Sequence, residues 1–79
     1  MEKAKKMFEE TGFELTLSDK NCIMYEECTK HFHTTVIFDL KTKEMVFESI
    51  DVQSGDCIPM TVSSKIFSAI EQQRKELGW

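Results

Sequence analysis

The sequence predicts an α+β fold: a short N-terminal helix, an antiparallel β-meander of three to four strands, and a C-terminal amphipathic helix packed on one face of the sheet. Two observations predict it. Residues 13–52 alternate apolar and polar side chains with a period of two, as strands with one buried face do. Both ends of the chain instead space apolar residues as helices do. With no linker or repeat among the 79 residues, we expect one complete, compact domain, residues 1–79.

The first third of the chain predicts a helix and two strands. Residues 1–10 form the helix, with Ala4 and Phe8 on one side and Gly12 placed to end it in the left-handed conformation. Residues 13–17 alternate as a strand, the polar residues 18–21 form a turn, and residues 22–26 form a second strand.

Residues 31–40 predict the longest strand, with two distinct faces. We expect the core side to carry Phe32, Thr34, Val36, Phe38 and Leu40, and the other side His31, His33, Thr35, Ile37 and Asp39. A polar connection leads to a fourth strand, residues 45–52, in which either face can be the buried one. Val46, Ile50 and Val52 share one of its faces, and Met45 and Phe47 the other. We expect both faces to be partly covered, by helices on one side and by a partner on the other.

The last nineteen residues predict a capped amphipathic helix that follows a loop at residues 53–59. Thr61 or Ser63 is expected to cap it by accepting hydrogen bonds from the unpaired backbone N–H groups of the first turn. Its apolar stripe is expected to comprise Val62, Ile66, Phe67, Ile70 and Leu77. Trp79 is expected to anchor the C-terminus by packing rather than to bind a partner.

Composition restricts the class of partner. Ten basic residues stand against fourteen acidic ones, a net charge of −4, whereas duplex binding needs clustered Lys and Arg. Nucleic acid is therefore not expected as a direct partner, and a basic surface of another protein suits the charge better. No stretch approaches the roughly 20 apolar residues of a membrane span, and residues 1–10 lack the apolar run of a signal peptide. We expect no membrane contact and a cytoplasmic protein.

The cluster that most resembles a metal site contains Cys28, His31 and His33, with Cys57 as a fourth ligand. Thiolate and imidazole are the ligands that zinc prefers. The spacing lacks the two paired motifs of a structural zinc site, so we expect exposed histidines, cysteines that fill gaps in the core, and no metal or cofactor. A Cys with a His base can also act as a nucleophile, but no local motif supports catalysis here. We expect no enzyme and no catalytic residues.

A surface for another protein is the remaining candidate site. Apolar or aromatic side chains with a polar rim are typical of interfaces. The residues that we expect to form this surface, on the sheet face away from the helices, are Ile23, Tyr25, His31, His33, Ile37 and Glu48. The alternative is that the first helix covers this face.

The end of the chain, Glu76-Leu77-Gly78-Trp79, resembles the ends of small uncharacterised proteins encoded by phages and prophages of Gram-positive bacteria. The upstream segments that fit the same pattern are Gly12-Phe13, Tyr25-Glu26, Ile37-Phe38-Asp39 and Lys41-Lys43. The resemblance implies a small accessory protein in the cytoplasm of a bacterial host, where such proteins often bind and block a host factor. Anti-CRISPR and other anti-defence proteins are commonly short, acidic and free of catalytic residues.

We therefore expect a non-enzymatic phage protein that acts by protein–protein interaction with a host or phage protein, as an inhibitor of a host defence complex. A homodimer through a sheet edge or the apolar sheet face is a further expectation. An alternative is a protein that sequesters a small ligand or signalling nucleotide, which requires that Lys41, Lys43, Lys65 or Arg74 converge on one pocket. A zinc-stabilised interaction module is the third alternative.

Overall fold

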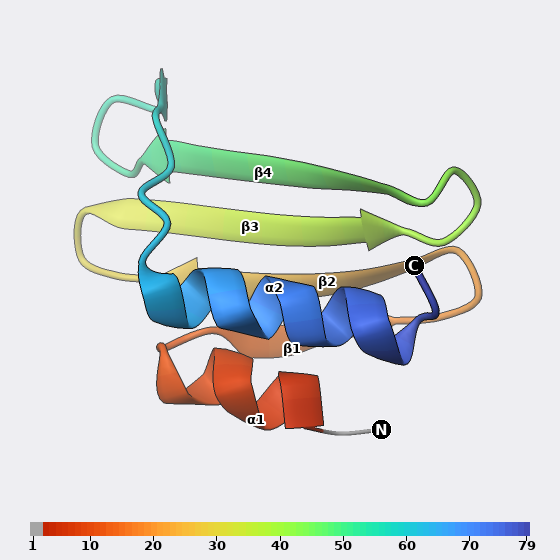
Figure 1. Ribbon diagram of the computed structural model, residues 1–79. Coiled ribbons are helices and arrows are strands. Elements are labelled where there is room, and N and C mark those ends of the chain that lie inside the picture. The colour runs from red at the N-terminus through yellow and green to blue at the C-terminus, as the bar shows by residue number, and fades with distance from the viewer. Residues whose placement is uncertain (1–2) are drawn as a thin grey trace.

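The computed structural model describes residues 3–79 and has the predicted α+β architecture (Figure 1). Its elements are α1 (Lys3–Glu10), β1 (Glu14–Ser18), β2 (Cys22–Cys28), β3 (Phe32–Asp39), β4 (Glu44–Asp51), β5 (Cys57–Ile58) and α2 (Ser64–Glu76). The strands form one antiparallel sheet in the order β1-β2-β3-β4-β5. The sheet has one strand more than predicted, because the two residues of β5 pair with β4 inside the segment expected to be a loop.

The strand register divides the sheet into two faces. Tyr25 of β2 lies opposite Val36 of β3, and Val36 lies opposite Phe47 of β4, so these three side chains share a face. Phe8 of α1 stacks on Tyr25, and both helices lie over this side (Figure 1). We call it the helix face, and we call the opposite side, on which no helix of the described chain packs, the open face. Val36 and Phe38 are fully buried, as predicted for the core side of this strand.

α1 follows the prediction closely within the described residues. Ala4 and Phe8 are both buried, and the helix ends at Glu10. Gly12 then takes the left-handed conformation, with φ of 97°, and Phe13 donates its N–H to the carbonyl of Phe8. This tight end turns the chain directly into β1.

α2 is capped at both ends by its own sequence. The Ser63 hydroxyl accepts the N–H of Ile66 at 3.2 Å, which is one of the two predicted caps. At the other end the helix stops at Glu76. Gly78 donates its N–H to Lys75 O at 3.1 Å and Trp79 donates to Arg74 O at 2.9 Å, the two bonds of a Schellman motif. This motif turns the last residue back onto the sheet, where the rings of Trp79 and Phe38 lie 6.2 Å apart.

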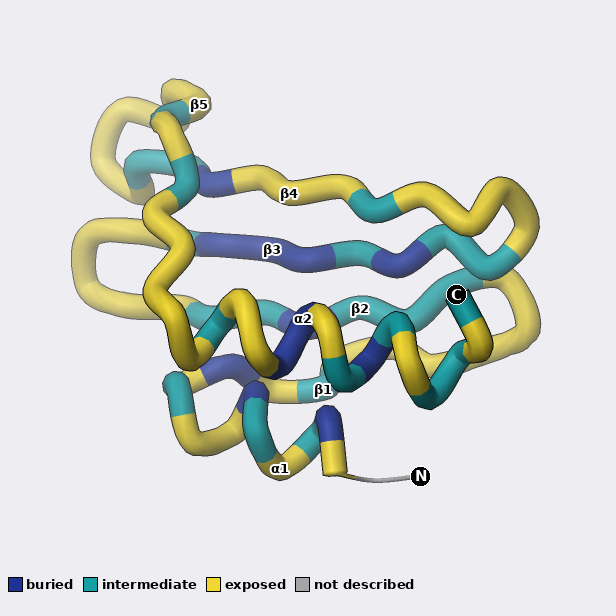
Figure 2. Tube along the Cα trace, in the orientation of Figure 1, coloured by how far each residue is buried: buried dark blue, intermediate teal, exposed yellow. Residues whose placement is uncertain are grey.

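The buried stripe of α2 differs from the predicted one. Ala69, Ile70 and Gln73 are buried, whereas Phe67 is 58% exposed and Val62 is 45% exposed. The prediction that these two apolar residues face the core was wrong. A helix packed on a sheet buries only a narrow stripe of side chains. In α2 this stripe contains Ile70 and Gln73, and Gln73 is held there by its hydrogen bond with Tyr25. Figure 2 shows the buried positions concentrated in β3 and along α2, while most of β4 is exposed.

Tyr25 joins the three parts of the fold. Its ring stacks on Phe8 of α1 with centroids 3.9 Å apart and planes 15° apart. Its hydroxyl donates to Gln73 Oε1 of α2 at 2.6 Å, in a buried environment. The helices also meet directly, since Glu76 of α2 accepts the N–H of Ala4 at 2.9 Å in the first turn of α1. A carboxylate at this position satisfies a free N–H and complements the positive end of the helix.

We expect Ile70→Ala to lower the free energy of unfolding by about 2–5 kcal/mol, since truncation of a buried large side chain leaves a cavity. The matched control is Phe67→Ala on the exposed side of the same helix, which should change it by less than about 1 kcal/mol. Urea unfolding of the two variants measures both effects. Equal losses would contradict this orientation of α2.

Tyr25 should make stability fall at high pH. Burial, together with the nearby charges of Glu76 and Glu9, raises the pKa of Tyr25 to about 12. A tyrosine in the unfolded chain ionises near 10, so the contribution is complete below about pH 10 and is lost as the pH rises toward 12. The slope is at most about 1.4 kcal/mol per pH unit.

The measurement is the difference in unfolding free energy between the wild type and Tyr25→Phe from pH 9 to 12, which cancels the titration of the lysines. At neutral pH the free energy of unfolding of the variant should be about 1–3 kcal/mol lower than that of the wild type, because the amide oxygen of Gln73 loses its buried hydrogen-bond donor. The difference should shrink above about pH 10. A constant difference across this range would show that Tyr25 ionises as freely in the fold as in the unfolded chain.

Candidate functional site: the open face of the sheet

The side chains of the open face form rows that cross the strands, and one row is entirely apolar. Leu17 lies opposite Met24, Met24 opposite Ile37, and Ile37 opposite Val46. A bulge between Leu15 and Leu17 shifts the register of β1, which brings Leu17 into this row although Leu15 packs against the core. Leu17 is 39% and Val46 50% exposed, so the row ends in solvent at both sides of the sheet. We call it the apolar row.

The next row on the same face carries three carboxylates. Glu14 lies opposite Glu26, Glu26 opposite Thr35, and Thr35 opposite Glu48. Like charges placed directly opposite each other across two strands destabilise a sheet, so this acidic row is not explained by stability. Asp39 and Glu44 lie opposite each other on the other side of the apolar row. Carboxylates therefore border the apolar row on both sides.

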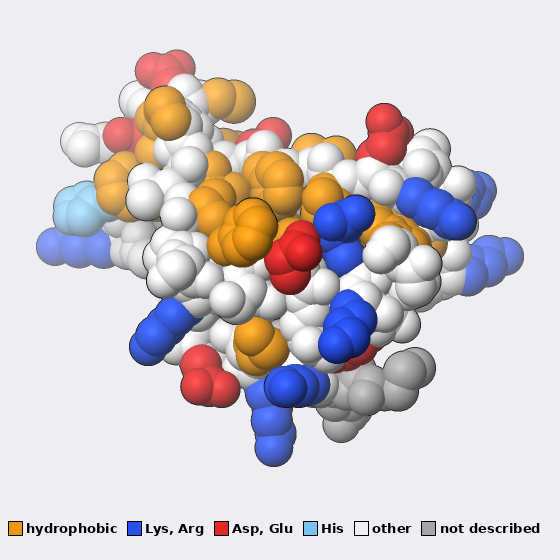
Figure 3. All heavy atoms as spheres, in the orientation of Figure 1, with side chains coloured by type: hydrophobic (Ala, Val, Ile, Leu, Met, Phe, Trp, Pro, Cys, Tyr) orange, Lys and Arg blue, Asp and Glu red, His pale blue; other side chains and the backbone are white. Residues whose placement is uncertain are grey.

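No basic side chain offsets these charges within the sheet. None of the five strands, all of which lie in the described part of the chain, contains Lys or Arg. Among the residues of these five strands, His33 is the one cationic candidate on this face, and its Nε2 lies 3.3 Å from Glu26 Oε1. Figure 3 shows Lys and Arg side chains spread over the helix side and the periphery of the molecule. The open face is thus acidic with an apolar centre, and the basic residues are kept in helices and turns.

A third row contains the residues considered as zinc ligands. Cys28 lies opposite His33, but Ile50 separates His33 from Cys57, and His31 precedes β3 in a turn. Among residues 3–79 no three His, Cys, Asp or Glu side chains come together in a group that could hold a metal. Cys28 and Cys57 are exposed on the open face, so the prediction that the cysteines fill gaps in the core was wrong.

The structure separates the residues predicted to form the interaction surface. His33, Ile37 and Glu48 lie on the open face, and His31 is exposed in the turn before β3. Tyr25 is only 2% exposed and Ile23 packs against the same core, so neither belongs to that surface.

The cause of this error is the register. β2 is apolar on both faces, and pairing Tyr25 with Val36 instead of Ile37 reverses every assignment in the strand. For the same reason Met24 and Glu26, which lie on the open face, were not predicted to belong to the surface. Leu17 was missed because β1 carries a bulge after Leu15 that periodicity does not reveal.

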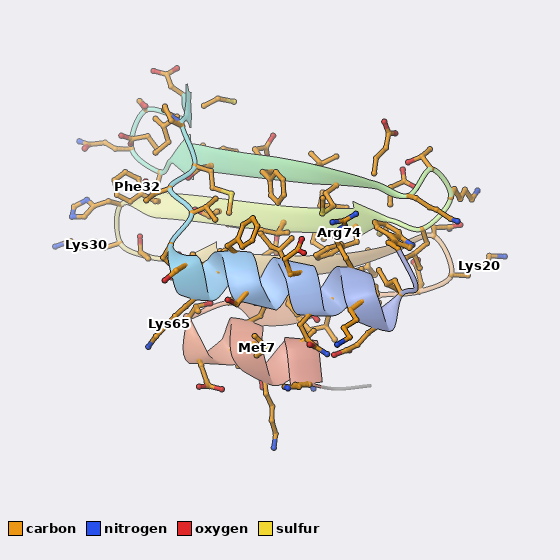
Figure 4. All side chains as sticks on the ribbon, viewed as in Figure 1. Met7, Lys20, Lys30, Phe32, Lys65 and Arg74 are labelled. Atoms are coloured by element: carbon orange, nitrogen blue, oxygen red, sulfur yellow. The ribbon has the colours of Figure 1, made fainter. Side chains whose placement is uncertain are left out.

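The basic residues considered for a phosphate-bearing ligand do not share a pocket. Lys65 lines a hollow of about 240 Å³ with Met7 and Thr11, whereas Arg74 lines a different one on the outer side of α2. Figure 4 shows Lys65 at the start of α2 and Arg74 farther along it, about 13 Å apart by helical rise. Lys41 and Lys43 lie in the turn between β3 and β4.

The helix face also contains a groove of about 450 Å³ beside the start of α2, with Phe32 at its rim. Its apolar walls include Phe13, Ile58 and Ile66, and its single ionisable lining residue is Glu27. A groove of this composition has no cation with which to bind phosphate.

Comparison with protein-family models, curated protein sequences and solved structures returned no significant match to this chain. Neither helix in the described part of the chain has the length and apolar content that a bilayer crossing requires. The candidate site therefore rests on the geometry of the open face alone.

We expect the purified protein to contain no stoichiometric zinc, since no three His, Cys, Asp or Glu side chains of the described residues form a group that could hold a metal. Elemental analysis after purification without chelator measures the metal content. Cys28→Ser should change the melting temperature as little as an ordinary surface substitution does. About one zinc per chain, lost in this variant, would contradict the expectation.

Proposed function

We propose that this chain acts without a chemical step, by binding another protein through the open face of its sheet. The observation that carries the proposal is the apolar row Leu17, Met24, Ile37 and Val46, which stands beside an acidic row on a face that no described helix covers. Contiguous exposed apolar side chains with a polar rim mark interaction sites on small proteins.

The charge of the face selects the chemistry of the partner. A complementary surface has Lys or Arg opposite Glu14, Glu26 and Glu48, and apolar side chains opposite Ile37 and Val46. Charge complementarity of this kind speeds association and rejects acidic competitors, while the apolar centre supplies most of the affinity. The partner is thus a basic protein surface with an apolar centre.

The biological setting that we propose is a bacterial cytoplasm, in which the protein serves as a phage or prophage accessory factor. The resemblance of the Glu76-Leu77-Gly78-Trp79 ending to phage proteins supports this setting. A host protein that binds nucleic acid carries a basic channel, and an acidic face with an apolar centre suits such a channel. We therefore propose a host defence complex as the target that the protein blocks.

The test uses the tagged protein as bait in a lysate of a Gram-positive bacterium. We expect a stoichiometric partner that is lost at least tenfold with Ile37→Lys, which places a charge in the apolar row, and with Glu48→Lys, which reverses a charge in the acidic row. Lys75→Glu, exposed on α2, is the matched control and should retain the partner. Quantitative mass spectrometry measures capture, and circular dichroism verifies folding.

A partner captured equally by all three variants would overturn the proposal, since it would bind elsewhere. A second check uses Cys28 and Cys57 as attachment points for a photocrosslinker, because both are exposed on the open face. We expect crosslinks to the same partner from either position. If neither cysteine gives a crosslink to a partner that the protein captures, the interface does not lie on the open face.

A further inference from the structure

One edge of the sheet is left unpaired over more than half of a strand. All eight residues of β4 pair with β3, but only Ser49 and Ile50 pair with β5. Residues 44–48 therefore form an open edge about 17 Å long. Asp51 donates its N–H outward to Asp56 O, and because this direction alternates along a strand, Met45 and Phe47 also direct their N–H and C=O groups outward. Figure 1 shows no other element beside this half of β4.

The other two edges carry features that prevent pairing with any strand, whereas this one carries only the charges of Glu44 and Glu48, which oppose pairing with an acidic strand. β1 is interrupted by the bulge between Leu15 and Leu17, and β5 is two residues long and is followed by Pro59. Residues 44–48 have no Pro, no Lys and no bulge. An extended edge without such protection is a template for another strand.

The side chains beside this edge are exposed and apolar on both faces. Val46, on the open face, is 50% exposed, and Phe47, on the helix face, is 44% exposed. Apolar side chains also gather on the helix side between α2 and β4, as Figure 3 shows. Glu44 and Glu48 flank Val46 on the open face, and both are exposed. A strand added here would bury apolar surface on both faces and meet two carboxylates.

We infer that the open edge of β4, residues 44–48, pairs with an extended segment of the protein partner that carries a basic side chain at each end and apolar side chains between them. The inference rests on the proposed function, since it names what part of that partner is recognised. Lys or Arg lies opposite Glu44 and Glu48, and apolar residues lie opposite Met45, Val46 and Phe47. Main-chain hydrogen bonds supply affinity and the alternate side chains supply specificity, as in other cases of strand addition.

A second copy of the chain fits this edge poorly. Antiparallel pairing of two copies about Val46 uses the whole edge, but it places Glu44 opposite Glu48 twice, and like charges so placed repel. Pairing about Phe47 brings the second copy onto Ser49 and Ile50, which already pair with β5. Pairing about Met45 extends into Lys43, whose φ of 60° is not that of a strand. The charges therefore favour a basic segment over self-pairing.

The test titrates the full chain with a fluorescent peptide, Gly-Ser-Lys-Val-Ile-Val-Lys-Ser-Gly, and with a matched peptide in which Glu replaces both Lys. We expect the wild type to prefer the Lys peptide by about tenfold, and the double variant Glu44→Lys with Glu48→Lys to prefer the Glu peptide. Amide exchange at Met45 and Phe47 should slow when the Lys peptide binds. Equal affinity for the two peptides, or no binding, would overturn the inference.

The backbone contribution is tested at Phe47. Phe47→Pro removes an N–H that points away from β3, whereas Phe47→Val shortens the side chain but retains that N–H. We expect the Pro variant to lose peptide binding and the Val variant to retain most of it. If the Pro variant does not fold, the switch of peptide preference in the double variant Glu44→Lys with Glu48→Lys tests the pairing of residues 44–48 by itself. Concentration-dependent dimers with slow exchange at Met45 and Phe47 would assign the edge to a second copy and overturn the inference.

The two proposals fail separately. Ile37 lies on β3, one strand away from the open edge, so Ile37→Lys should still bind the Lys peptide while it loses the partner protein. If Ile37→Lys loses the partner but the wild type binds no peptide, only the inference about residues 44–48 is rejected. If the wild type binds the peptide but Ile37→Lys captures the partner as well as the wild type does, only binding through the open face is rejected.

Discussion

The central contact of the fold is the one between Tyr25 and the two helices. The ring of Tyr25 lies flat on Phe8 of α1, and its hydroxyl reaches Gln73 of α2. A single side chain from the second strand thus contacts both helices. Because both are held on its side, the other side of the sheet has no cover within the described chain.

The distribution of charge follows from the same asymmetry. All Lys and Arg of the described chain lie in helices and turns, whereas Glu14, Glu26 and Glu48 lie in strands. Opposed carboxylates such as Glu14 and Glu26 lower the stability of the fold. The apolar row beside them is also unfavourable, because its side chains are exposed to water. Both features are unfavourable in the isolated protein, and a partner with complementary charge and apolar surface would stabilise them. This supports the binding function that we propose.

The sequence predicted those features that local chemistry determines. Gly12 ends α1, Ser63 caps α2, and the alternation in residues 31–40 identifies Val36 and Phe38 as core. Features that depend on pairing between strands were not predictable in the same way. β2 is apolar on both faces, so only its register with β3 shows that Tyr25 is buried and Met24 is not. The apolar and acidic rows exist only once four strands are aligned, and no single strand contains either of them.

The difference between the two faces of the sheet can be measured by nuclear magnetic resonance on the methyl groups of Val36 and Val46 in the presence of a paramagnetic cosolvent. The two residues have the same side chain and lie on neighbouring strands, but Val36 is fully buried under the helices and Val46 is 50% exposed on the open face. We expect strong relaxation of the Val46 methyls and little of the Val36 methyls, at any protein concentration. Equal protection of both would show that the open face is covered and is not available to a partner.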